Sequence, residues 1–518
     1  MQVTMGLRRA ASIRGNDPAM IDGDVRRTWR ETQNRVARLA GALQRIGLAP
    51  GDRVAILMLN SHRYLELYYA VPWAGGLVMP LNIRLSPTEI LAQITDAEPS
   101  FIVVDDTFHR VTAALATQMP SIRAVIHAGG TAAADQTISY ESLVADGPAV
   151  DDADLGGDDV YGIYYTGGTT AASKGVMLTH DNIVVNAYNV ALSASYQSRD
   201  VYLHAAPMFH AADGASTFAV TMVGATHTFI PAFDPARWAQ AVDAFAVTTC
   251  LIVPTMINAL VQWPGLAAHS LRSLRLLLYG ASPISRPLLA EAQKKFRCEW
   301  QQGYGMTETS PVLTMLPAAD HALEGPTVHR LASAGLPVPN VEVAVLDGEG
   351  HRVAPGTVGE ICARGPVVMK GYWRKPEETA RAIRDGFMHT GDLGYMDEDG
   401  YVYLVDRVKD MIVTGGENVY SVEVEAVLYS HPAVLEAAVF GIPHETLGEQ
   451  VHATVVLKEN RQVLPEDLIA HCRQAIGGYK CPKTISVHGE PLPKSGAGKI
   501  LKRELRAKYW AGFERQIH

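Results

Sequence analysis

Small hydroxyl residues, glycines and one lysine are concentrated in the segment YYTGGTTAASKGVMLTH, residues 164–180. Backbone N–H groups of such a segment can surround phosphate oxygens, and Lys174 can bring a positive charge to them. The segment is not the common loop G-x-x-x-x-G-K-[ST], because Ser173 stands at the second glycine position and Gly175 at the hydroxyl position. The later segment SGAGKI fails the same comparison, since Pro493 stands at its first glycine position. Phosphate binding by a loop of another kind is the first chemistry that the sequence suggests.

Four further segments follow at large separations in the chain. They are LLLYGASPIS, QQGYGMTETSP, GFMHTGDLGYMDEDGYVYLVDRVKDMIVTGGENVYSVEVE and PKSGAGKILKREL. Each alone would be read as an ordinary turn or a solvated charged face. Together and in this order, the five segments resemble the AMP-forming acyl-CoA synthetase, luciferase and adenylation-domain superfamily, and most of all its fatty-acid and aryl-acid CoA ligases. The resemblance covers nearly the whole chain.

The resemblance implies a site for ATP and Mg²⁺. In the first segment the β- and γ-phosphates would contact Thr166, Gly167, Gly168, Thr169, Thr170 and Lys174. Thr307 would be the phosphate-binding threonine, and Glu308 the Mg²⁺ ligand, a role that suits a hard carboxylate oxygen. Adenine would stack on Tyr304, because small neighbours let the backbone approach a base. Those neighbours would be Gly303 and Gly305 on one side and the turn Gly280, Ala281, Ser282 on the other.

Further contacts follow from the same resemblance. Asp392 would hold the ribose hydroxyls with Arg407 beside it, although both also look like ordinary turn and strand charges. Lys499 resembles the mobile catalytic lysine, which bridges the carboxylate and the α-phosphate and offsets their repulsion. Lys409 matches the hinge of the C-terminal domain. The glycine loop before the helix, with Gly415, Gly416 and Glu417, would let the pantetheine arm of coenzyme A pass.

His210 in PMFHAADG resembles the histidine or aromatic gate of the acyl pocket, and a satisfied core histidine is the alternative. The following small residues, Ala211, Ala212, Gly214 and Ala215, indicate room for a bulky or extended acyl group. No arginine near this segment indicates a dicarboxylate substrate. We therefore expect a medium- or long-chain fatty acid or an aryl acid as the substrate.

The implied enzyme is an AMP-forming acyl-CoA synthetase that makes acyl-AMP and pyrophosphate, then acyl-CoA and AMP. One alternative is a stand-alone adenylating enzyme that loads a carrier protein. Another is a non-catalytic nucleotide- or acyl-binding module, and Ala171 is the reason to consider it. The family usually has glycine there, and at a positive φ the added methyl group costs roughly 1 kcal/mol. We expect Ala171 to slow adenylation without abolishing it.

The elements that must carry these residues are those of an α/β protein. An amphipathic pattern predicts a helix over residues 29–47, and short apolar runs predict buried parallel strands. These runs are residues 52–59, 99–106, 122–129, 247–254 and 274–280. Past about Gly335, alternating segments with D-G and P-G turns predict antiparallel hairpins. We expect two α/β subdomains and a β-rich subdomain in an N-terminal adenylate-forming domain, residues 1–408, and a small mobile α+β C-terminal domain, residues 409–518.

Composition limits the class of protein. The 518 residues include 47% hydrophobic and 19% charged ones, as in a globular enzyme, and the net charge of −9 argues against nucleic acid as a partner. Residues 214–233 are uncharged but contain polar residues and a proline, so we expect a buried helix followed by a strand, not a membrane span. Without a signal-like start or paired cysteines, we expect a cytoplasmic protein with reduced thiols. The expected partners are the acid, ATP and CoA, and a homodimer is compatible with the sequence.

Overall fold

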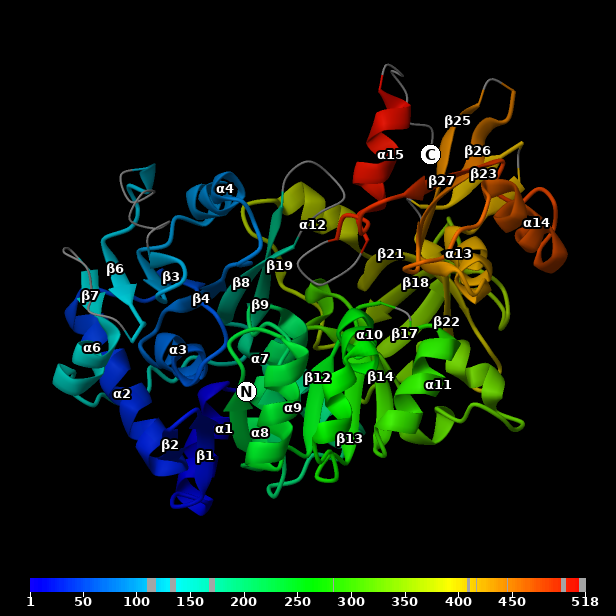
Figure 1. Ribbon diagram of the computed structural model, residues 1–518. Coiled ribbons are helices and arrows are strands. Elements are labelled where there is room, and N and C mark those ends of the chain that lie inside the picture. Colours follow the sequence, from blue (N-terminus) through cyan, green and yellow to red (C-terminus); the bar gives the residue numbers. More distant parts are fainter. Residues whose placement is uncertain are drawn as a thin grey trace.

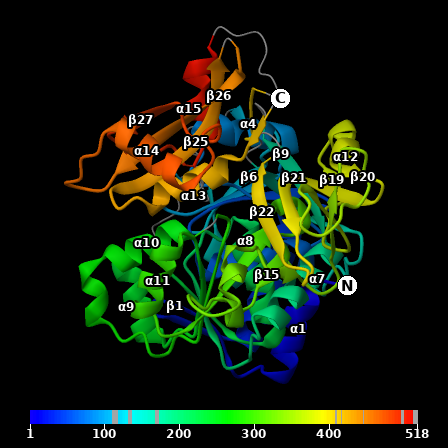
Figure 2. The same cartoon turned by 90° about the vertical axis from the view of Figure 1, so that its right-hand side faces the viewer.

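The computed structural model describes residues 1–109, 118–130, 137–166, 173–282, 284–407, 410–415, 417–444, 446–494 and 500–511. Within them the strands form two large sheets, of nine and eight strands, and two smaller ones of five strands each. Figures 1 and 2 both show the C-terminal elements, in orange and red, above the green helices of the nine-stranded sheet. The chain is a mixed α/β protein with a large N-terminal domain of several sheets and a small C-terminal domain, as predicted.

The eight-stranded sheet has the order β19-β9-β8-β4-β3-β5-β6-β7. Its strands from β8 to β7 are parallel, and short apolar runs fill them because helices cover the sheet. The predicted strands at 52–59, 99–106 and 122–129 are confirmed as β3, β5 and β6. The bounds are β3 (Arg53–Leu57), β4 (Leu77–Pro80), β5 (Phe101–Val104), β6 (Ala124–His127), β7 (Thr137–Ser139), β8 (Val160–Thr166), β9 (Lys174–Thr179) and β19 (Gly371–Tyr372).

The nine-stranded sheet has the order β16-β15-β14-β13-β12-β10-β11-β1-β2. The predicted strands at 247–254 and 274–280 are confirmed as the parallel neighbours β12 and β13. The bounds are β1 (Pro18–Asp22), β2 (Val25–Thr28), β10 (Val201–His204), β11 (Thr226–Phe229), β12 (Thr249–Ile252), β13 (Leu276–Gly280), β14 (Glu299–Gly305), β15 (Val312–Leu316) and β16 (Leu336–Pro337).

Helices cover both sheets, and a buried cluster that both sheets share joins them. The predicted helix at 29–47 is α2, which begins with a reciprocal capping box between Thr28 and Glu31. Residues 214–233 fold as predicted, with the buried helix α8 followed by β11. Phe218 of α8 packs in the same buried cluster as Tyr161 of β8 and Tyr202 of β10, so α8 links the two sheets. The helices are α1 (Thr4–Ile13), α2 (Trp29–Arg45), α3 (His62–Trp73), α4 (Pro87–Ala97), α6 (Tyr140–Asp146), α7 (His180–Ser193), α8 (Ala211–Val223), α9 (Pro235–Phe245), α10 (Pro254–Gln262) and α11 (Arg286–Lys295).

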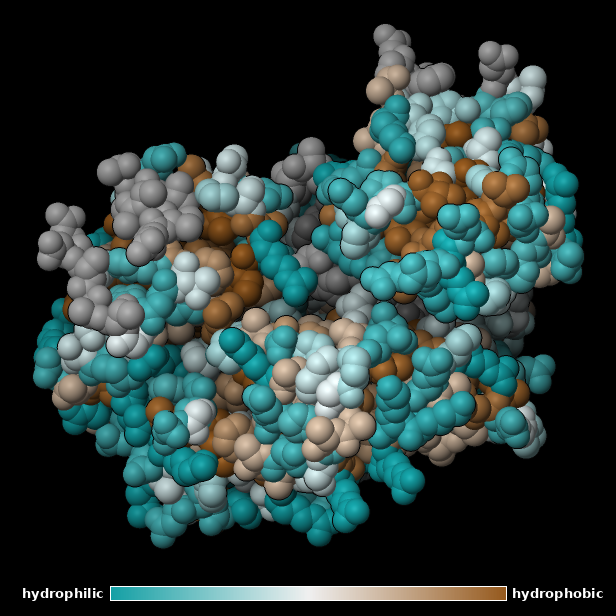
Figure 3. Space-filling model, viewed as in Figure 1, coloured by the Kyte–Doolittle hydropathy of each residue, from teal (hydrophilic) through white to brown (hydrophobic). Residues whose placement is uncertain are grey.

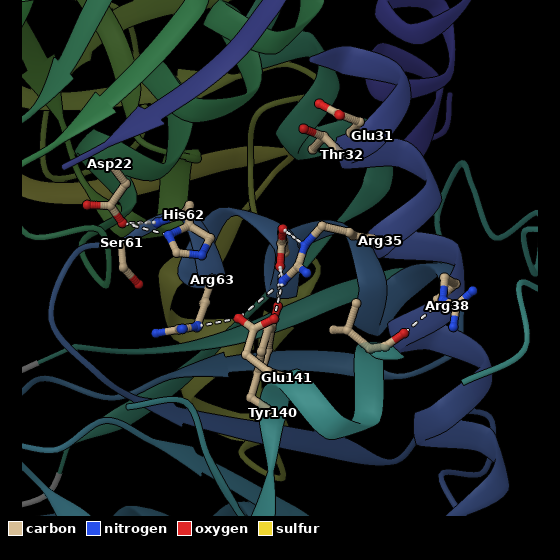
Figure 4. Close-up of polar contacts among 12 residues, drawn as sticks. Asp22, Glu31, Thr32, Arg35, Arg38, Ser61, His62, Arg63, Tyr140 and Glu141 are labelled. Atoms are coloured by element: carbon tan, nitrogen blue, oxygen red, sulfur yellow. Dashed lines mark hydrogen bonds and ion pairs between the residues drawn. The ribbon is translucent and has the colours of Figure 1, made fainter. Parts of the chain in front are cut away.

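A charged network fixes three helices beside the eight-stranded sheet (Figure 4). Arg35 of α2 forms an ion pair with the buried Glu66 of α3, with Nε 2.6 Å from Oε1. The hydroxyl of Tyr140 donates to the other Glu66 oxygen at 2.7 Å. Glu141 of α6 accepts from Arg35 and from Arg63 of α3. Because both charges of the buried pair are balanced and hydrogen-bonded, the network ties α2, α3 and α6 together instead of destabilising them.

The predicted hairpins past Gly335 form a five-stranded antiparallel sheet, in which β18 pairs with β17 and β21, and β21 also pairs with β20 and β22. Its elements are β17 (Glu342–Leu346), β18 (Gly359–Arg364), α12 (Pro376–Ala382), β20 (Ile383–Arg384), β21 (Phe387–Met396) and β22 (Val402–Arg407). The last sheet is formed only by residues from Ile412 onward, with a separate buried cluster. Its elements are β23 (Ile412–Thr414), β24 (Glu417–Val419), α13 (Ser421–Ser430), β25 (Val434–His444), β26 (Gly448–Leu457), α14 (Pro465–Ala475), β27 (Thr484–His488) and α15 (Lys502–Trp510).

The surface and the cysteines agree with the compositional expectations. The face in Figure 3 is mainly hydrophilic, with apolar residues in separate patches. Across the described part of the chain, no helix combines the length and the apolar character needed to cross a membrane. All five cysteines are free thiols, and four of them are buried.

Candidate active site

The predicted phosphate loop connects two neighbouring strands. Thr166 ends β8 and Lys174 begins β9, and the two residues face each other across the antiparallel pair. The predicted contacts Gly167, Gly168, Thr169 and Thr170, and also Ala171, lie outside the described residues. Lys174 forms an ion pair with Glu378 of α12, and its Nζ lies 4.8 Å from the ring centroid of Tyr372. The lysine is therefore held in place by an anion and an aromatic face.

Glu308 is a buried carboxylate beside this lysine. It lies in a single turn of 3₁₀ helix, η3 (Thr307–Thr309), directly after β14, and is only 6% exposed. Burial raises the pKa of Glu308, while the hydroxyl of Tyr372, which donates to Oε1 at 2.9 Å, opposes that shift. Tyr372 thus contacts both Glu308 and Lys174 and holds the two predicted residues together. Thr307 is the neighbouring residue of the same turn.

Gly280 allows the end of β13 to approach β14 closely. Gly280 and Gly303 are register partners, and a Cβ atom on Gly280 would lie 2.5 Å from the carbonyl oxygen of Gly303. A Cβ atom on Gly305 would lie 1.8 Å from the carbonyl oxygen of Pro311. Ala281, after β13, has φ +66°, a left-handed conformation that is unusual for alanine. Ser282 follows it. The predicted adenine-binding residues of the two strands therefore lie side by side.

The predicted ribose residues form a direct network with Tyr304. Asp392 and Arg407 are register partners in β21 and β22, and Arg407 Nε lies 2.9 Å from Asp392 Oδ1. The hydroxyl of Tyr304, 88 residues earlier in the chain, donates to Asp392 Oδ2 at 2.8 Å. Each carboxylate oxygen keeps a second lone pair that can accept a hydrogen bond from a ribose hydroxyl. The nine-stranded sheet and the β-rich sheet meet at this contact.

The residue before Arg407 connects this site to the C-terminal sheet. Asp406 Oδ1 accepts from the hydroxyl of Ser421 at 3.0 Å, and Ser421 in turn accepts from Lys502. Lys502 Nζ also lies 2.8 Å from Glu425 Oε1. Burial alone would lower the pKa of Lys502, but the carboxylates of Glu425 and Asp406 raise it above its ordinary value. The ammonium group therefore stays charged inside a network that spans both domains.

The remaining predicted residues lie at other places in the fold. His210 is the N-cap residue of α8, half-buried, with its ring 4.4 Å from that of Phe209. Gly415, with φ +60°, follows β23, and Glu417 begins β24, so both belong to a hairpin of the C-terminal sheet. The predicted residues Gly416, Lys409 and Lys499 lie outside the described residues.

Two cavities in the described part of the molecule flank the nine-stranded sheet. The larger, about 650 Å³, is open and is lined by residues such as Arg275 and Glu299, at the amino ends of β13 and β14. It therefore lies at the amino ends of these strands, whereas Gly280 and Gly303 lie toward their carboxyl ends. The smaller, about 70 Å³, lies at the carboxyl ends of β10 and β11, and its lining includes Asn60, Arg84 and Pro207. The carbonyl oxygen of Pro207 accepts from the backbone N–H of His210, so this cavity is the one next to the predicted gate.

Tyr372, Glu378 and Arg84 were not predicted from the sequence. Tyr372 and Glu378 stand in the segment GYWRKPEET, which contains no glycine-rich loop or paired-charge spacing of its own. Arg84 is far in sequence from His210, and only the meeting of the two large sheets brings it to the small cavity. None of the three could be recognised from local spacing.

The family described as AMP-binding enzyme matches residues 7–373, and the family described as AMP-binding enzyme C-terminal domain matches residues 423–499. A feruloyl-CoA synthase of an Amycolatopsis species is 39% identical over 502 residues, which are 97% of this chain and 98% of that protein. A fatty acid–[acyl-carrier-protein] ligase of Streptomyces coeruleorubidus is 35% identical over 509 residues, 97% of this chain and 95% of that protein. The crystal structure of ATP-bound MatB from Rhodopseudomonas palustris superimposes with a TM-score of 0.88 at 32% identity, covering 98% of this chain and 99% of that chain.

Proposed function

Because this chain belongs to the AMP-binding enzymes, and among them to the AMP-forming acid:CoA ligases, we propose that it joins a carboxylic acid to coenzyme A at the expense of ATP. In the first half-reaction, a carboxylate oxygen attacks the α-phosphorus of ATP, and pyrophosphate leaves. In the second, the thiol sulfur of CoA attacks the acyl carbon, loses its proton, and AMP leaves with the bridging oxygen. The mixed anhydride makes the acyl group reactive because AMP is a far better leaving group than an oxide.

One observation carries the proposal. Residues from four separate segments converge in two adjoining contacts, Tyr304 with Asp392 and Arg407, and Glu308 with Tyr372, which faces Lys174. Tyr304 and Glu308 are four residues apart, so the two contacts adjoin. A carboxylate that can accept from ribose hydroxyls thus lies beside a lysine and a buried carboxylate that suit phosphates and their ion, and this supports a nucleoside triphosphate as the ligand.

The residues also fit Mg²⁺. A carboxylate buried as deeply as Glu308 is costly unless its charge is balanced, and Mg²⁺ prefers such hard oxygen ligands. Glu308 would hold the ion, with Tyr372 fixing the orientation of the carboxylate. The bound ion would neutralise charge on the phosphate oxygens. Lys174 would take its place beside these oxygens, and Thr307 would donate to them.

The two half-reactions need different faces of the C-terminal domain. We place the join between the domains at residues 408 and 409, after β22 and before β23, with Lys409 as the hinge. Lys499 serves the first half-reaction, where it brings a positive charge between two anions. Gly415 and Gly416 serve the second, where the lack of side chains leaves room for a narrow thiol arm.

The proposed acid has an apolar body. His210 at the start of α8 would gate the acyl site, and the small residues after it favour an apolar body. The similarity to a feruloyl-CoA synthase supports an aryl acid, and the similarity to a fatty-acid ligase supports a medium- or long-chain fatty acid. CoA is the proposed acceptor, and a carrier protein is the alternative.

A panel assay tests the proposal. The full chain is incubated with Mg²⁺, ATP, CoA and one of ferulate, cinnamate, benzoate, octanoate or palmitate, and acyl-CoA and AMP are measured by mass. We expect acyl-CoA from at least one acid. Acyl-AMP without acyl-CoA, converted only when a carrier protein is added, would favour the alternative acceptor.

Glu308→Gln tests the Mg²⁺ site in the same assay. We expect it to lose at least about 100-fold in adenylation, because a buried neutral amide cannot hold the ion. Glu398→Gln, which removes an exposed carboxylate on the turn after β21, is the matched control and keeps full activity. Binding of ATP without AMP from any acid in the unmodified protein would contradict the catalytic proposal.

A further inference from the structure

Three side chains with metal-ligating atoms converge on the β-rich sheet, outside the nucleotide site. Glu360 and Cys362 lie on β18, and His389 lies on β21 as the direct register partner of Cys362. His389 Nδ1 is 2.8 Å from Glu360 Oε2 and 3.3 Å from Cys362 Sγ. The three ligand atoms all lie within 4.8 Å of one another.

While Arg384 stays in its present position, the polar atoms of this cluster cannot all be satisfied by protons. His389 Nδ1 also lies 2.7 Å from Nη2 of Arg384, a group that can only donate. If Nδ1 carries a proton, it donates to Glu360 but faces an N–H of Arg384. If Nδ1 is unprotonated, it accepts from Arg384 but turns its lone pair toward the Glu360 carboxylate. Either way one close contact is repulsive.

A metal ion would relieve this conflict, because it accepts lone pairs from all three groups at once. We propose that Glu360, Cys362 and His389 bind a Zn²⁺ ion. Thiolate, imidazole and carboxylate are the ligands of zinc, and bonds of about 2.0–2.3 Å to a tetrahedral ion place the ligand atoms about 3.3–3.8 Å apart. The two separations from His389 Nδ1, 2.8 Å to Glu360 and 3.3 Å to Cys362, lie within about 0.5 Å of that range. Binding releases the thiol proton of Cys362 to solvent.

The surroundings permit the ion to enter. The side chain of Arg384 is 52% exposed and can turn into solvent, whereas those of His389 and Glu360 are 11% and 21% exposed. Cys362 is fully buried and closes the inner side. The site would thus have three protein ligands and one position open to water. Arg384 would compete with the ion for the Nδ1 atom of His389.

The proposed ion would reinforce the strand that carries Asp392. The other oxygen of Glu360, Oε1, accepts from the backbone N–H of Gly391 at 3.0 Å. Because zinc would use Oε2, this hydrogen bond can remain, and the ion would tie β18 to the residue next to Asp392. The expected effect is on thermal stability, and it does not depend on the proposed ligase reaction.

The test uses the tag-free full chain, stripped of metal and then titrated with Zn²⁺ alone. We expect one ion per chain, a higher Tm, and a thiolate charge-transfer band when Co²⁺ replaces Zn²⁺. Loss of an outer-shell partner already costs ten- to a hundredfold in metal affinity, so Cys362→Ser is expected to weaken Zn²⁺ binding by about 100-fold or more and to remove the Co²⁺ band. Arg384→Gln removes the competing cation and is expected to tighten binding, an effect that misfolding cannot imitate.

The matched control is His351→Ala, because Asp347, Glu349 and His351 form a second, exposed group of ligand atoms. This control is expected to keep the stoichiometric ion. The proposal is overturned if Zn²⁺ binds no tighter than to the Cys362→Ser protein, if His351→Ala removes the ion, or if Arg384→Gln leaves the affinity unchanged.

Discussion

A single tyrosine side chain organises the phosphate end of the candidate site. The hydroxyl of Tyr372 donates to Glu308, and its ring faces the ammonium of Lys174. A hydrogen bond to a buried charged group is worth about 1.5–3 kcal/mol, more than one between neutral groups. Removing the hydroxyl while keeping the ring therefore abolishes the hydrogen bond to Glu308 and keeps the contact with Lys174.

We expect Tyr372→Phe to fold normally, to reduce the rate of ATP–pyrophosphate exchange by about tenfold, and to require more Mg²⁺ for half-maximal rate. The loss arises because the Glu308 carboxylate is no longer oriented. Tyr395→Phe is the matched control, since Tyr395 lies on β21 and stacks on Tyr403 away from these contacts. An unchanged Mg²⁺ dependence would remove the positioning role.

At Ala171, the prediction from the sequence stays open because the residue lies outside the described part of the chain. If it adopts a positive φ, Ala171→Gly relieves roughly 1 kcal/mol and raises the exchange rate several-fold. Exchange kinetics with varied ATP test it. Equal kcat and equal KM for ATP in the two proteins would show that the methyl group does not matter.

The elements next to the loop are fixed by a buried histidine. His180 begins α7 directly after β9, and its Nδ1 accepts from the backbone N–H of Val3 at 3.2 Å, which joins α1 to α7. Burial lowers the pKa of His180 from 6.5 to about 4, so the folded protein holds it neutral. The pKa values of His321 and His452 are lowered to about 4 for the same reason.

Stability should therefore fall in mild acid. The unfolded chain binds protons at these histidines below about pH 6.5, whereas the folded chain does so only near pH 4. The stability that the neutral histidines contribute above pH 6.5 is therefore lost as the pH falls toward 4. For His180 the loss between pH 7.5 and pH 5 is about 2 kcal/mol. His180→Asn, whose Oδ1 can still accept from Val3, should show a smaller fall in Tm between these pH values. His351→Asn, at an exposed position, should behave like the unmodified protein, and equal falls in all three proteins would refute the assignment.

At the scale of the whole molecule, the two domains share a charged network. Asp406, before the proposed hinge, is bonded to Ser421, which accepts from the buried Lys502. If the C-terminal domain turns about residue 409 as proposed, Ser421 and Lys502 move together, and Asp406 loses its hydrogen bonds from Ser421. Specific contacts between described residues of the two domains therefore hold this arrangement.

The proposed roles of the two domains predict the effect of Lys499→Ala. We expect acyl-AMP formation to fall by at least about 100-fold, because a charge that stabilises the transition state is lost. Conversion of supplied acyl-AMP and CoA to acyl-CoA should remain. Lys458→Ala, at an exposed position of the C-terminal sheet, is the control. Equal loss of both steps would contradict the two-arrangement assignment.

Local patterns in the sequence predicted the elements but not their meeting points. The run of residues 274–280 is apolar and ends in glycine, which predicts a buried strand and its end. The contact of Tyr304 with Asp392 joins two different sheets. The family resemblance assigned both residues to one nucleotide site but did not predict their hydrogen bond. Tyr372 carried no signal. The cluster around Cys362 depends on the register of β18 against β21, which shifts between Glu360 and Cys362 and cannot be read from either strand alone.

The ion pair between Lys174 and Glu378 bears on how ionic strength acts on the site. An incoming phosphate would replace Glu378 as the anionic partner of Lys174, so the number of charges near the lysine would change little. Added salt should therefore weaken nucleotide binding less than it would if Lys174 had no anionic partner in the free protein. The displaced carboxylate has Lys375 and Arg381 nearby, which already lower its pKa together with Lys174. Glu378 can therefore leave the lysine without becoming an isolated negative charge.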